Sequence, residues 1–345
     1  MTLAIFFTGA TGYIGGACLE HLLGDGSFQI TALVRSADKA KKLGEVGVTT
    51  LVGSLDDTDT VTKAAAEADI VYHTADSDNY GAIEAILKGM KQRHERTGAV
   101  PILIHTSGTG VLADNAAGMY DTNVIYYDND VDQMASLPPT AIHRNVDLEI
   151  LAADAEGSIK SYIVLPSTIW GTLTGRLVDL GISNKHSIQI PAAIKASIGR
   201  GQGGVVGAGK SLWPHVEIHE AVADLFNLVL RAALDGTAPH GREGYFFGES
   251  GEYCLIDAAR AYTKTLYELG KSKTAEPDPF TVEDAQKYFK GTFFFCLGSN
   301  SRARALRGRE LGWKPVKTTD DFLKSLIATT RMLAEDSGKD GATEM

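Results

Sequence analysis

The sequence predicts an α/β fold in which a parallel sheet is covered by helices on both faces. Short apolar runs rich in β-branched and aromatic residues alternate with helix-like stretches over the first part of the 345-residue chain, and this alternation is typical of doubly wound sheets. Hydrophobicity within the runs is continuous, which fits strands buried on both sides. The alternation stops after about residue 170, where a smaller second region is expected.

Strands and helices are expected to follow one another in strict order. The strands are expected at residues 3–8, 28–34, 48–52, 69–73, 100–106 and 160–165, and the helices at 13–23, 37–45, 57–66, 79–95 and 141–155. Beyond residue 170 the sequence predicts a mobile glycine-rich loop over 199–210, helices over 217–234, 255–269 and 318–334, and a strand near 244–248. The three phenylalanines at 293–295 predict a further buried strand.

Charge and composition exclude several classes of partner. The chain has 33 Lys and Arg against 43 Asp and Glu, a net charge of −10. Nucleic-acid binding and attachment to an anionic membrane both need a dense basic surface, so neither is expected. The three cysteines are far apart and odd in number, which disfavours a disulfide framework and favours the reducing cytoplasm. No apolar run approaches the ~18 residues of a membrane-spanning helix.

A glycine-rich segment lies at the first strand–helix junction. Thr8-Gly9-Ala10-Thr11-Gly12-Tyr13-Ile14-Gly15 follows the first expected strand and opens the first expected helix. Its three glycines suit a tight turn, a close approach of the backbone to a pyrophosphate, and close packing of helix on strand. Amides at the start of the helix then face the negative phosphates. In this context the segment predicts dinucleotide binding rather than a turn without a ligand.

The residue after the second strand indicates which dinucleotide is bound. Enzymes that use NAD usually have an acidic residue there for the ribose 2′-hydroxyl, whereas this chain has Arg35, followed by Lys39, Lys41 and Lys42. A guanidinium pairs well with a 2′-phosphate, so we expect NADP(H) in preference to NAD(H). The three lysines are interpreted as solvated charges on a helix.

With these features the chain resembles the short-chain dehydrogenase/reductase superfamily, in its extended and atypical branches. Those branches include the nucleotide-sugar epimerases and dehydratases, dihydroflavonol-reductase-like enzymes and NmrA-like proteins. The resemblance spans about residues 3–330 and rests on an ordered set of motifs. These lie at residues 8–15, 53–57, 69–75, 165–171, 216–223 and 310–315.

The resemblance implies a Rossmann domain over residues 1–171, completed by segments from about 211–248, and a mainly substrate-binding region over 172–334. Residues 335–345 are expected to be a flexible tail. The cofactor is expected across the carboxyl ends of the strands, with the substrate pocket between the two regions. The residues implied to bind the cofactor are Gly9, Thr11, Gly12, Tyr13, Ile14, Gly15, Arg35, Ser54, Leu55, Thr74, Ala75, Ser107, Pro166, Thr168 and Ile169.

The catalytic pattern of the family is changed in this chain. The family uses a Tyr-x-x-x-Lys pair, but the aligned segment has His143 at the Tyr position and Asp147 at the Lys position. A spacing of four residues places both on one face of the expected helix. A histidine exchanges protons near neutral pH, and a neighbouring carboxylate favours the imidazolium form that a general acid needs. Alternatively, the two residues form a surface ion pair and the catalytic function has been lost.

Hydroxyl groups and aromatic rings complete the expected active site. Ser107 and Thr109 flank the glycine that stands where the family has its catalytic hydroxyl; we expect Ser107 on the cofactor side and Thr109 on the substrate side. Tyr127, from the following loop, is a second candidate for the proton donor. The residues expected to line the substrate pocket are Tyr126, Trp170, Trp213 and His215.

Two other clusters have both a structural and a functional interpretation. His215 and His219 lie four residues apart near Glu217 and Glu220, but no third ligand is apparent and no metal is expected. The arginine cluster at 302–309 would suit a phosphorylated substrate, although a solvated basic helix is the commoner meaning.

Together these features predict an NADPH-dependent oxidoreductase that reduces a carbonyl or conjugated small molecule. The expected partners are the cofactor and a small-molecule substrate, in a monomer or homodimer. Two alternatives stay open. One is an epimerase, dehydratase or isomerase that retains its cofactor, and the other is an NmrA-like regulatory protein that senses the dinucleotide without turnover.

Overall fold

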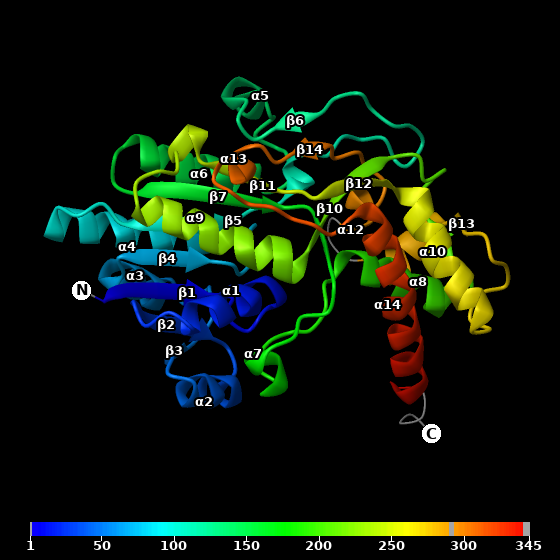
Figure 1. Ribbon diagram of the computed structural model, residues 1–345, viewed down its shortest axis with the longest axis horizontal. Coiled ribbons are helices and arrows are strands. Elements are labelled where there is room, and N and C mark those ends of the chain that lie inside the picture. Colours follow the sequence, from blue (N-terminus) through cyan, green and yellow to red (C-terminus); the bar gives the residue numbers. More distant parts are fainter. Residues whose placement is uncertain (1, 290–292, 341–345) are drawn as a thin grey trace.

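A seven-stranded sheet forms the centre of the molecule, and all its strands are parallel (Figure 1). The computed structural model describes residues 2–289 and 293–340. The strand order is β11-β7-β5-β4-β1-β2-β3. The strands are β1 (Leu3–Thr8), β2 (Phe28–Val34), β3 (Thr49–Val52), β4 (Ile70–His73), β5 (Ile102–Thr106), β7 (Lys160–Pro166) and β11 (Tyr245–Gly248). The predicted doubly wound α/β fold is confirmed.

Helices cover both faces of this sheet. On one face α1 (Tyr13–Leu23) packs against α9 (Asp224–Leu234), and on the other α4 (Tyr80–Thr97) packs between α3 (Thr58–Glu67) and α6 (Arg144–Ala155). The short helix α2 (Ala37–Glu45) lies beyond β3, at the edge of the sheet (Figure 1). The chain order reverses between β1 and β4, so the crevice at the carboxyl ends of these strands is where such sheets bind ligands.

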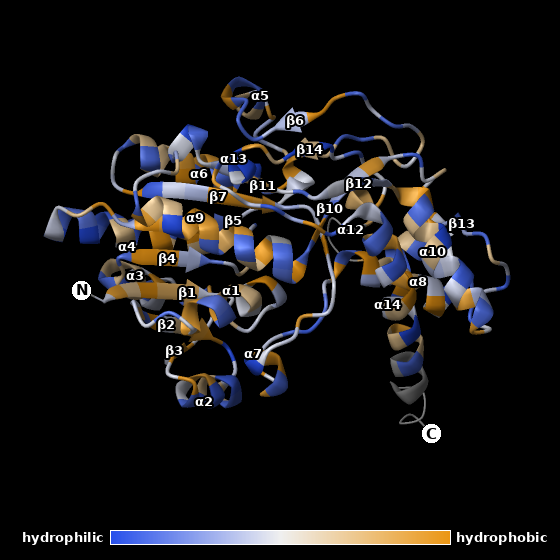
Figure 2. Cartoon of the chain, in the orientation of Figure 1, coloured by the Kyte–Doolittle hydropathy of each residue, from blue (hydrophilic) through white to orange (hydrophobic). Residues whose placement is uncertain are grey.

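The strands are buried because their side chains are almost uniformly apolar. Phe6 and Phe7 of β1 are at most 1% exposed, and the Phe7 ring stacks on Tyr72 of β4 with centroids 4.9 Å apart. Figure 2 shows hydrophobic residues along the central strands and hydrophilic residues on the outer sides of the covering helices. Burial of this continuous apolar surface supplies the main driving force for folding.

A smaller region is built around a second sheet of three strands, in the order β12-β10-β8. These strands are β8 (Thr168–Trp170), β10 (Leu212–Glu217) and β12 (Gly251–Cys254). The helices α8 (Gln189–Arg200), α10 (Leu255–Glu268) and α14 (Thr319–Asp340) pack against one another beside it (Figure 1).

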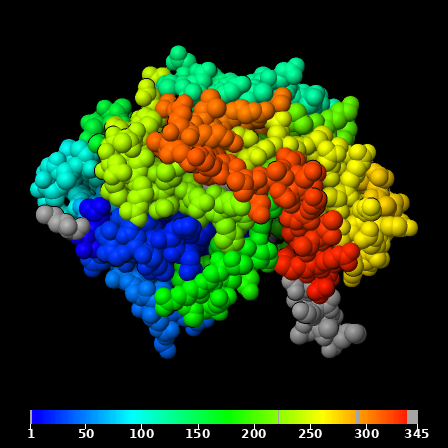
Figure 3. Space-filling view, in the orientation of Figure 1, coloured from blue at the N-terminus to red at the C-terminus, as the bar shows by residue number. Residues whose placement is uncertain are grey.

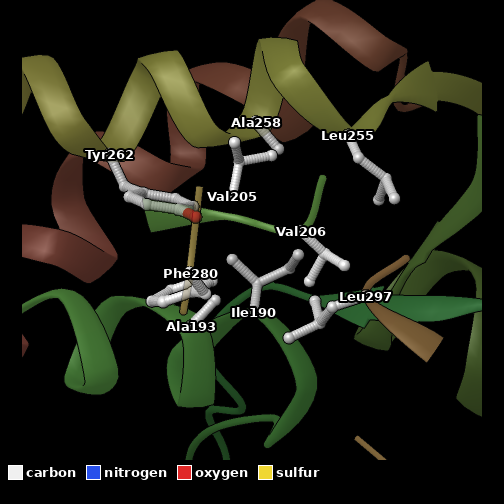
Figure 4. Close-up of a pocket in the computed structure, with 9 residues that line it drawn as sticks. All are labelled: Ile190, Ala193, Val205, Val206, Leu255, Ala258, Tyr262, Phe280 and Leu297. Carbon is white, nitrogen blue, oxygen red and sulfur yellow. The ribbon is translucent and has the colours of Figure 1, made fainter. Parts of the chain in front are cut away.

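This smaller region has an apolar core of its own. In Figure 4 the side chains of Ile190, Val205, Leu255, Tyr262 and Phe280 point toward one another from separate segments. The space left between them is only about 20 Å³, about the size of one water molecule. This is therefore packed interior and not a ligand cavity.

Short elements connect these layers. They are η1 (Thr109–Leu112), β6 (Tyr126–Tyr127), α5 (Val131–Ala135), α7 (Arg176–Asp179), β9 (Gly204–Val205), η2 (Ile218–Ala223), η3 (Gly241–Glu243), β13 (Asp278–Pro279), α11 (Val282–Tyr288), α12 (Phe293–Cys296), β14 (Ala303–Arg304) and α13 (Arg307–Glu310). The segment η2 is a turn of π-helix that continues into α9. In the described part of the chain, no helix is long and apolar enough to cross a membrane.

The structure corrects several predicted elements of the second half. The helix predicted over 217–234 is the end of β10, a π-helical turn and α9. Residues 293–295 lie in a short helix and not in a strand. Of the segments at 211–248 expected to complete the main sheet, only β11 joins it, because β10 pairs with β8 and β12 instead.

Two segments predicted to be mobile are more ordered than expected. The glycine-rich segment 199–210 contains β9 and is largely buried, because a side chain at Gly203 or Gly204 would overlap Thr263 or Phe280. These glycines therefore serve close packing rather than mobility. The predicted tail begins inside α14, which continues to Asp340; residues 341–345 lie outside the described part.

Candidate functional site

The glycine turn after β1 packs tightly against the end of β4. Gly9 has a φ of +79°, and a Cβ there would come 2.5 Å from the carbonyl carbon of Thr74. A Cβ on Gly15 would overlap the carbonyl oxygen of Gly9. The turn is closed by a hydrogen bond of 2.8 Å from the Gly12 amide to that same oxygen. Gly9 and Gly15 are thus required by steric contact, as the motif predicts.

The first turn of α1 has free amides that face a cleft. Its N-cap is Gly12, so no side chain caps the helix, and the first turn contains no acidic residue. The next two residues, Tyr13 and Ile14, line the cleft. Unpaired N–H groups and the positive end of the helix dipole favour an anion here. This cradle fits the pyrophosphate of a dinucleotide.

The cleft lies at the carboxyl ends of the central strands and has a volume of about 560 Å³, within the range of ligand sites. Segments of both regions form its walls. Figure 3 shows the segment after β8 lying directly against the first strand–helix unit, where the Asn184 amide donates to the Thr11 carbonyl over 3.3 Å. The residues that line the cleft include Asp76, Asp78, Gly108, Thr109, Ile142, His143, Ile169, Ile188, Gln189 and Trp213.

Six of the residues predicted to bind the cofactor line this cleft, two after β1, two after β4, one at the end of β7 and one in β8. They are Tyr13, Ile14, Thr74, Ala75, Pro166 and Ile169. Thr168 does not reach it, because its buried hydroxyl is hydrogen-bonded to the Tyr253 hydroxyl at 2.9 Å. Ser107 is likewise buried and directed toward Asp147.

Three residues predicted to bind the cofactor, Arg35, Ser54 and Leu55, lie outside the lining of the cleft, after β2 and β3. Arg35 follows β2 directly and is exposed to solvent. The loop after β3 folds back on itself, since the Ser54 amide donates to the Asp57 carboxylate over 2.6 Å and Leu55 is half-buried beside it. Both positions lie at the carboxyl ends of neighbouring strands.

His143 occupies a strained position at the start of α6. It is the N-cap residue, not part of the helix, and its φ of +67° lies in the left-handed region, which is costly for most side chains and frequently functional. The imidazole is 17% exposed, and its Nδ1 donates to the Asp78 carboxylate over 2.7 Å. A Cβ on Gly108 would stand 3.1 Å from Nε2. The ring is therefore fixed against the turn that leads to Thr109.

The carboxylate that binds His143 is that of Asp78. The sequence had suggested Asp147, and that prediction is wrong. Asp78 lies in the loop after β4, where Ser77 also contacts His143 Nδ1 at 3.2 Å. The hydrogen bond from His143 lowers the pKa of Asp78 below its usual range, so this carboxylate is ionised at neutral pH. A carboxylate on Nδ1 fixes the tautomer of a histidine and leaves Nε2 for proton exchange.

Asp147 instead belongs to a row of polar groups buried beneath the cleft. Its Oδ2 accepts a hydrogen bond from the Ser107 hydroxyl at 3.2 Å, and its Oδ1 is 3.9 Å from His105 Nε2. Thr8, His73 and His105 follow in register on β1, β4 and β5. The Thr8 hydroxyl and His73 Nδ1 share a hydrogen bond of 2.5 Å.

Burial changes the ionisation of this row. It raises the pKa of Asp147 to about 7 and lowers the pKa of His73 to about 4. The pKa of His105 also falls well below its usual range, through burial and then through the charges of His73 and His143. At neutral pH both buried imidazoles are uncharged and the carboxyl group is about half protonated.

The structure brings one of the predicted substrate residues, Trp213, to the cleft. Trp170 and His215 lie behind the wall, where the Trp170 indole donates to His215 Nδ1 over 3.1 Å. Tyr126 pairs with Ala303 in a two-stranded ribbon, and the neighbouring Tyr127 is exposed. Neither tyrosine is among the residues that line the cleft.

The remaining clusters have structural partners. Arg302 binds the Glu252 carboxylate through two hydrogen bonds of 2.8 and 2.9 Å, and Arg309 pairs with Glu249. Neither arginine lines the cleft, and Arg309 is exposed on the short helix α13. His219 contacts the Thr174 hydroxyl at 3.0 Å, and the described residues contain no group of three or more side chains suited to hold a metal ion.

Sequence reasoning missed two groups of lining residues. Asp76, Ser77 and Asp78 follow β4 directly, so the rule that loops after parallel strands meet at one edge would have placed them at the site. Gln189 and Cys296 reach the cleft from elements far apart in the sequence, and no local pattern marks them.

Comparison with known proteins agrees with this geometry. Residues 9–128 match a family model described as NAD(P)H-binding. The chain is similar to oxidase ucsJ from Acremonium sp., with 29% identity over 92% of this chain and 94% of that protein. It is 25% identical to 4-hydroxy-2-methyl-3-oxo-4-farnesyl-3,4-dihydroquinoline-1-oxide ketoreductase from Stigmatella aurantiaca, over 79% of this chain and 88% of that one.

Solved structures share the fold at low sequence identity. UDP-glucose 4-epimerase from Thermotoga maritima has a TM-score of 0.62 and 15% identity, covering 96% of this chain and 99% of its own. UDP-glucuronic acid 4-epimerase from Bacillus cereus, described in complex with UDP-glucuronic acid and NAD, has a TM-score of 0.63 and 14% identity, covering 96% and 100%.

The chain therefore contains an NAD(P)H-binding Rossmann domain. Its complete fold, including the smaller region, is shared with these two epimerases. The predicted resemblance is confirmed at this level.

Proposed function

We propose that the protein is an NADPH-dependent oxidoreductase that reduces a carbonyl or conjugated carbonyl group of a small molecule. The observation that carries this proposal is the His143–Asp78 pair on the cleft that begins at the glycine turn. Two similar proteins are named as an oxidase and a ketoreductase, which supports redox chemistry.

The chain offers a binding group for each part of the cofactor. The amides at the start of α1 would hold the pyrophosphate, and Arg35 would bind the 2′-phosphate. Thr74 and Ala75 after β4, and Pro166 and Ile169 near β7, would lie along the nicotinamide half. When bound, the reduced nicotinamide would supply the hydride.

His143 is the proposed proton donor. A carbonyl oxygen gains a proton when its carbon is reduced, and His143 Nε2 is the ring nitrogen not held by Asp78. Thr109 lies on the same side of the cleft, and its buried hydroxyl has no hydrogen-bond partner within the described residues. That hydroxyl would donate to the same oxygen, in the role expected for the substrate-side hydroxyl.

Asp147 is proposed as a positioning residue. It is completely buried and does not line the cleft, so it would not contact the ribose hydroxyls of the cofactor. Its hydrogen bond from Ser107 instead fixes the start of the loop that carries Thr109.

The test is the substitution His143→Asn. Asn tolerates the left-handed backbone conformation that His143 adopts, so the change removes the proton donor while preserving the loop. We expect kcat/KM to fall about 100-fold or more, with the Kd for NADPH unchanged. His240→Asn is the matched control, because His240 pairs with Asp154 at 3.0 Å away from the cleft.

The assay follows loss of NADPH absorbance with a panel of aldehydes, ketones and enones. Unchanged turnover in His143→Asn would exclude the proton-donor role. Tight NADPH binding with no turnover across the panel would favour the sensor alternative, and interconversion of stereoisomers without net cofactor consumption would favour the epimerase alternative.

A further inference from the structure

The wall that the smaller region contributes to the cleft carries two buried N–H donors without partners. Trp213 of β10 is 2% exposed, and its indole Nε1 has no hydrogen-bond partner among the described residues. The same is true of Nε2 of Gln189, the first residue of α8. Both side chains line the cleft.

Both residues stand on elements that pack against the smaller region. Ile190, next to Gln189, points into the apolar core of the smaller region (Figure 4). Trp213 is opposite Tyr253 in the antiparallel pair of β10 and β12. A buried donor without an acceptor is costly, so a ligand that presents an acceptor to these groups is favoured.

The chemistry of the two groups specifies what they bind. An indole N–H and an amide NH₂ only donate hydrogen bonds, so the occupant must present an acceptor. In the Rossmann half of the same cleft, His143 and Thr109 stand at the proposed reacting carbonyl. The acceptor that meets Trp213 and Gln189 is accordingly a second oxygen of the substrate.

Away from the start of α1, the charge of the cleft disfavours an anionic substrate. None of the described residues that line it is Lys or Arg, while the carboxylates Asp76 and Asp78 do line it. The arginines at 302 and 309 are engaged by Glu252 and Glu249 elsewhere. Much of the remaining wall is apolar and includes Ile142, Ile169 and Ile188.

Resting on the proposed function, we infer that the substrate is a neutral, largely apolar ketone with a second acceptor oxygen, such as an ester, lactone or second carbonyl. Trp213 and Gln189 recognise that second oxygen. A phosphorylated or nucleotide-linked substrate, such as those named for the structurally similar epimerases, lacks a countercharge in this cleft.

Three small probes of matched size test this inference. Ethyl benzoylformate is a neutral keto ester, benzoylformate is its anionic counterpart, and valerophenone is an alkyl ketone of the same length without the two ester oxygens and with a less reactive carbonyl. In the presence of NADPH we expect the keto ester to have a kcat/KM at least about tenfold above that of each of the others, the equivalent of one hydrogen bond.

Two variants assign that preference to the named donors. In Trp213→Phe and in Gln189→Met, the ratio of kcat/KM for the keto ester to kcat/KM for valerophenone should fall about tenfold relative to the parent protein, because the greater intrinsic reactivity of the keto ester is the same in all variants. Trp313→Phe is the matched control, because Trp313 is a buried tryptophan whose indole lies near the Glu220 carbonyl and does not line the cleft. Thermal unfolding of each variant shows whether it has folded.

A parallel binding measurement separates this inference from the proposed function. Binding of each probe to the NADPH-loaded protein is followed by its effect on thermal unfolding. A preference for the keto ester in binding that is lost in Trp213→Phe, without turnover, supports the inference and overturns the proposed function. Turnover of keto ester and valerophenone with equal kcat/KM overturns the inference alone. So does preferred use of benzoylformate, or binding of none of the three probes.

Discussion

The two walls of the cleft are built in different ways. The cofactor wall is organised around one glycine turn, in which Gly9 and Gly15 bring β1, α1 and β4 into close contact. The substrate wall consists of side chains from separate segments, such as Gln189 and Trp213. In the proposed function, the first would bind the cofactor largely through backbone groups, and the second would select the substrate through particular side chains.

Buried histidines behind the two walls differ in how many of their ring nitrogens have hydrogen-bond partners. Burial lowers the pKa of both His73 and His215 to about 4. His215 has a partner on each ring nitrogen, Trp170 and Thr319, whereas His73 Nε2 and both nitrogens of His105 have none among the described residues. A fully paired network is typical of a structural core, and unpaired buried groups are concentrated near functional sites.

The largest expected effect is on NADPH binding, from a side chain added at the glycine turn of the cofactor wall. A Cβ in Gly15→Ala would overlap the Gly9 carbonyl oxygen and the Thr74 hydroxyl, so we expect NADPH binding to become unmeasurable in a fluorescence titration. Gly44→Ala is the control, because a Cβ there meets nothing within 4 Å. Circular dichroism distinguishes loss of the site from loss of the fold. A Kd like that of the unchanged protein would show that the wall tolerates side chains.

A smaller effect, on the free energy of unfolding, is expected from Asp147 in the buried row of polar groups. Because the pKa of Asp147 is about 7 in the folded protein and near 3.8 when unfolded, the folded state binds the proton more strongly. The stability that this proton contributes is complete below about pH 4 and is lost as the pH rises to about 7. Asp147→Asn should therefore gain stability relative to the parent over this interval, by a few kcal/mol.

Urea denaturation at several pH values measures this difference. His73, whose lowered pKa gives the opposite slope, titrates in both proteins, and the measured difference belongs to Asp147 together with its neighbour His105, 3.9 Å away. A difference in the free energy of unfolding that does not change between pH 4 and 7 would contradict the raised pKa of Asp147.

The smallest expected effect is on the choice between NADPH and NADH, from the exposed residue Arg35. Arg35→Ala should raise the Kd for NADPH about tenfold, in line with loss of a charged hydrogen bond, and change the Kd for NADH much less. Lys41→Ala is the control, since Lys41 is an exposed cation of α2. If both dinucleotides weaken equally, Arg35 does not recognise the 2′-phosphate.

The sequence predicted the cofactor wall better than the substrate wall for a physical reason. The bounds of β2, α1 and α2 were predicted without error, because strand burial, glycine turns and helix patterns are local. The predicted partner of His143, Asp147, was wrong, because the actual partner Asp78 comes from another loop. Trp170 was expected in the pocket, but its indole is held by His215. The direction of a side chain in the smaller region depends on packing between distant segments.

The last strand of the main sheet also dictates when the protein can fold during synthesis. Strand β11 pairs with β7, but the whole of residues 167–244 must leave the ribosome between them, which takes several seconds at typical rates of translation. Until then the backbone hydrogen-bonding groups on one edge of β7 are unpaired. Phe246 and Phe247 of β11, which are buried in the folded protein, have not yet been synthesised. We therefore expect the nascent chain to depend on chaperones during this interval, and a product truncated before residue 245 to aggregate.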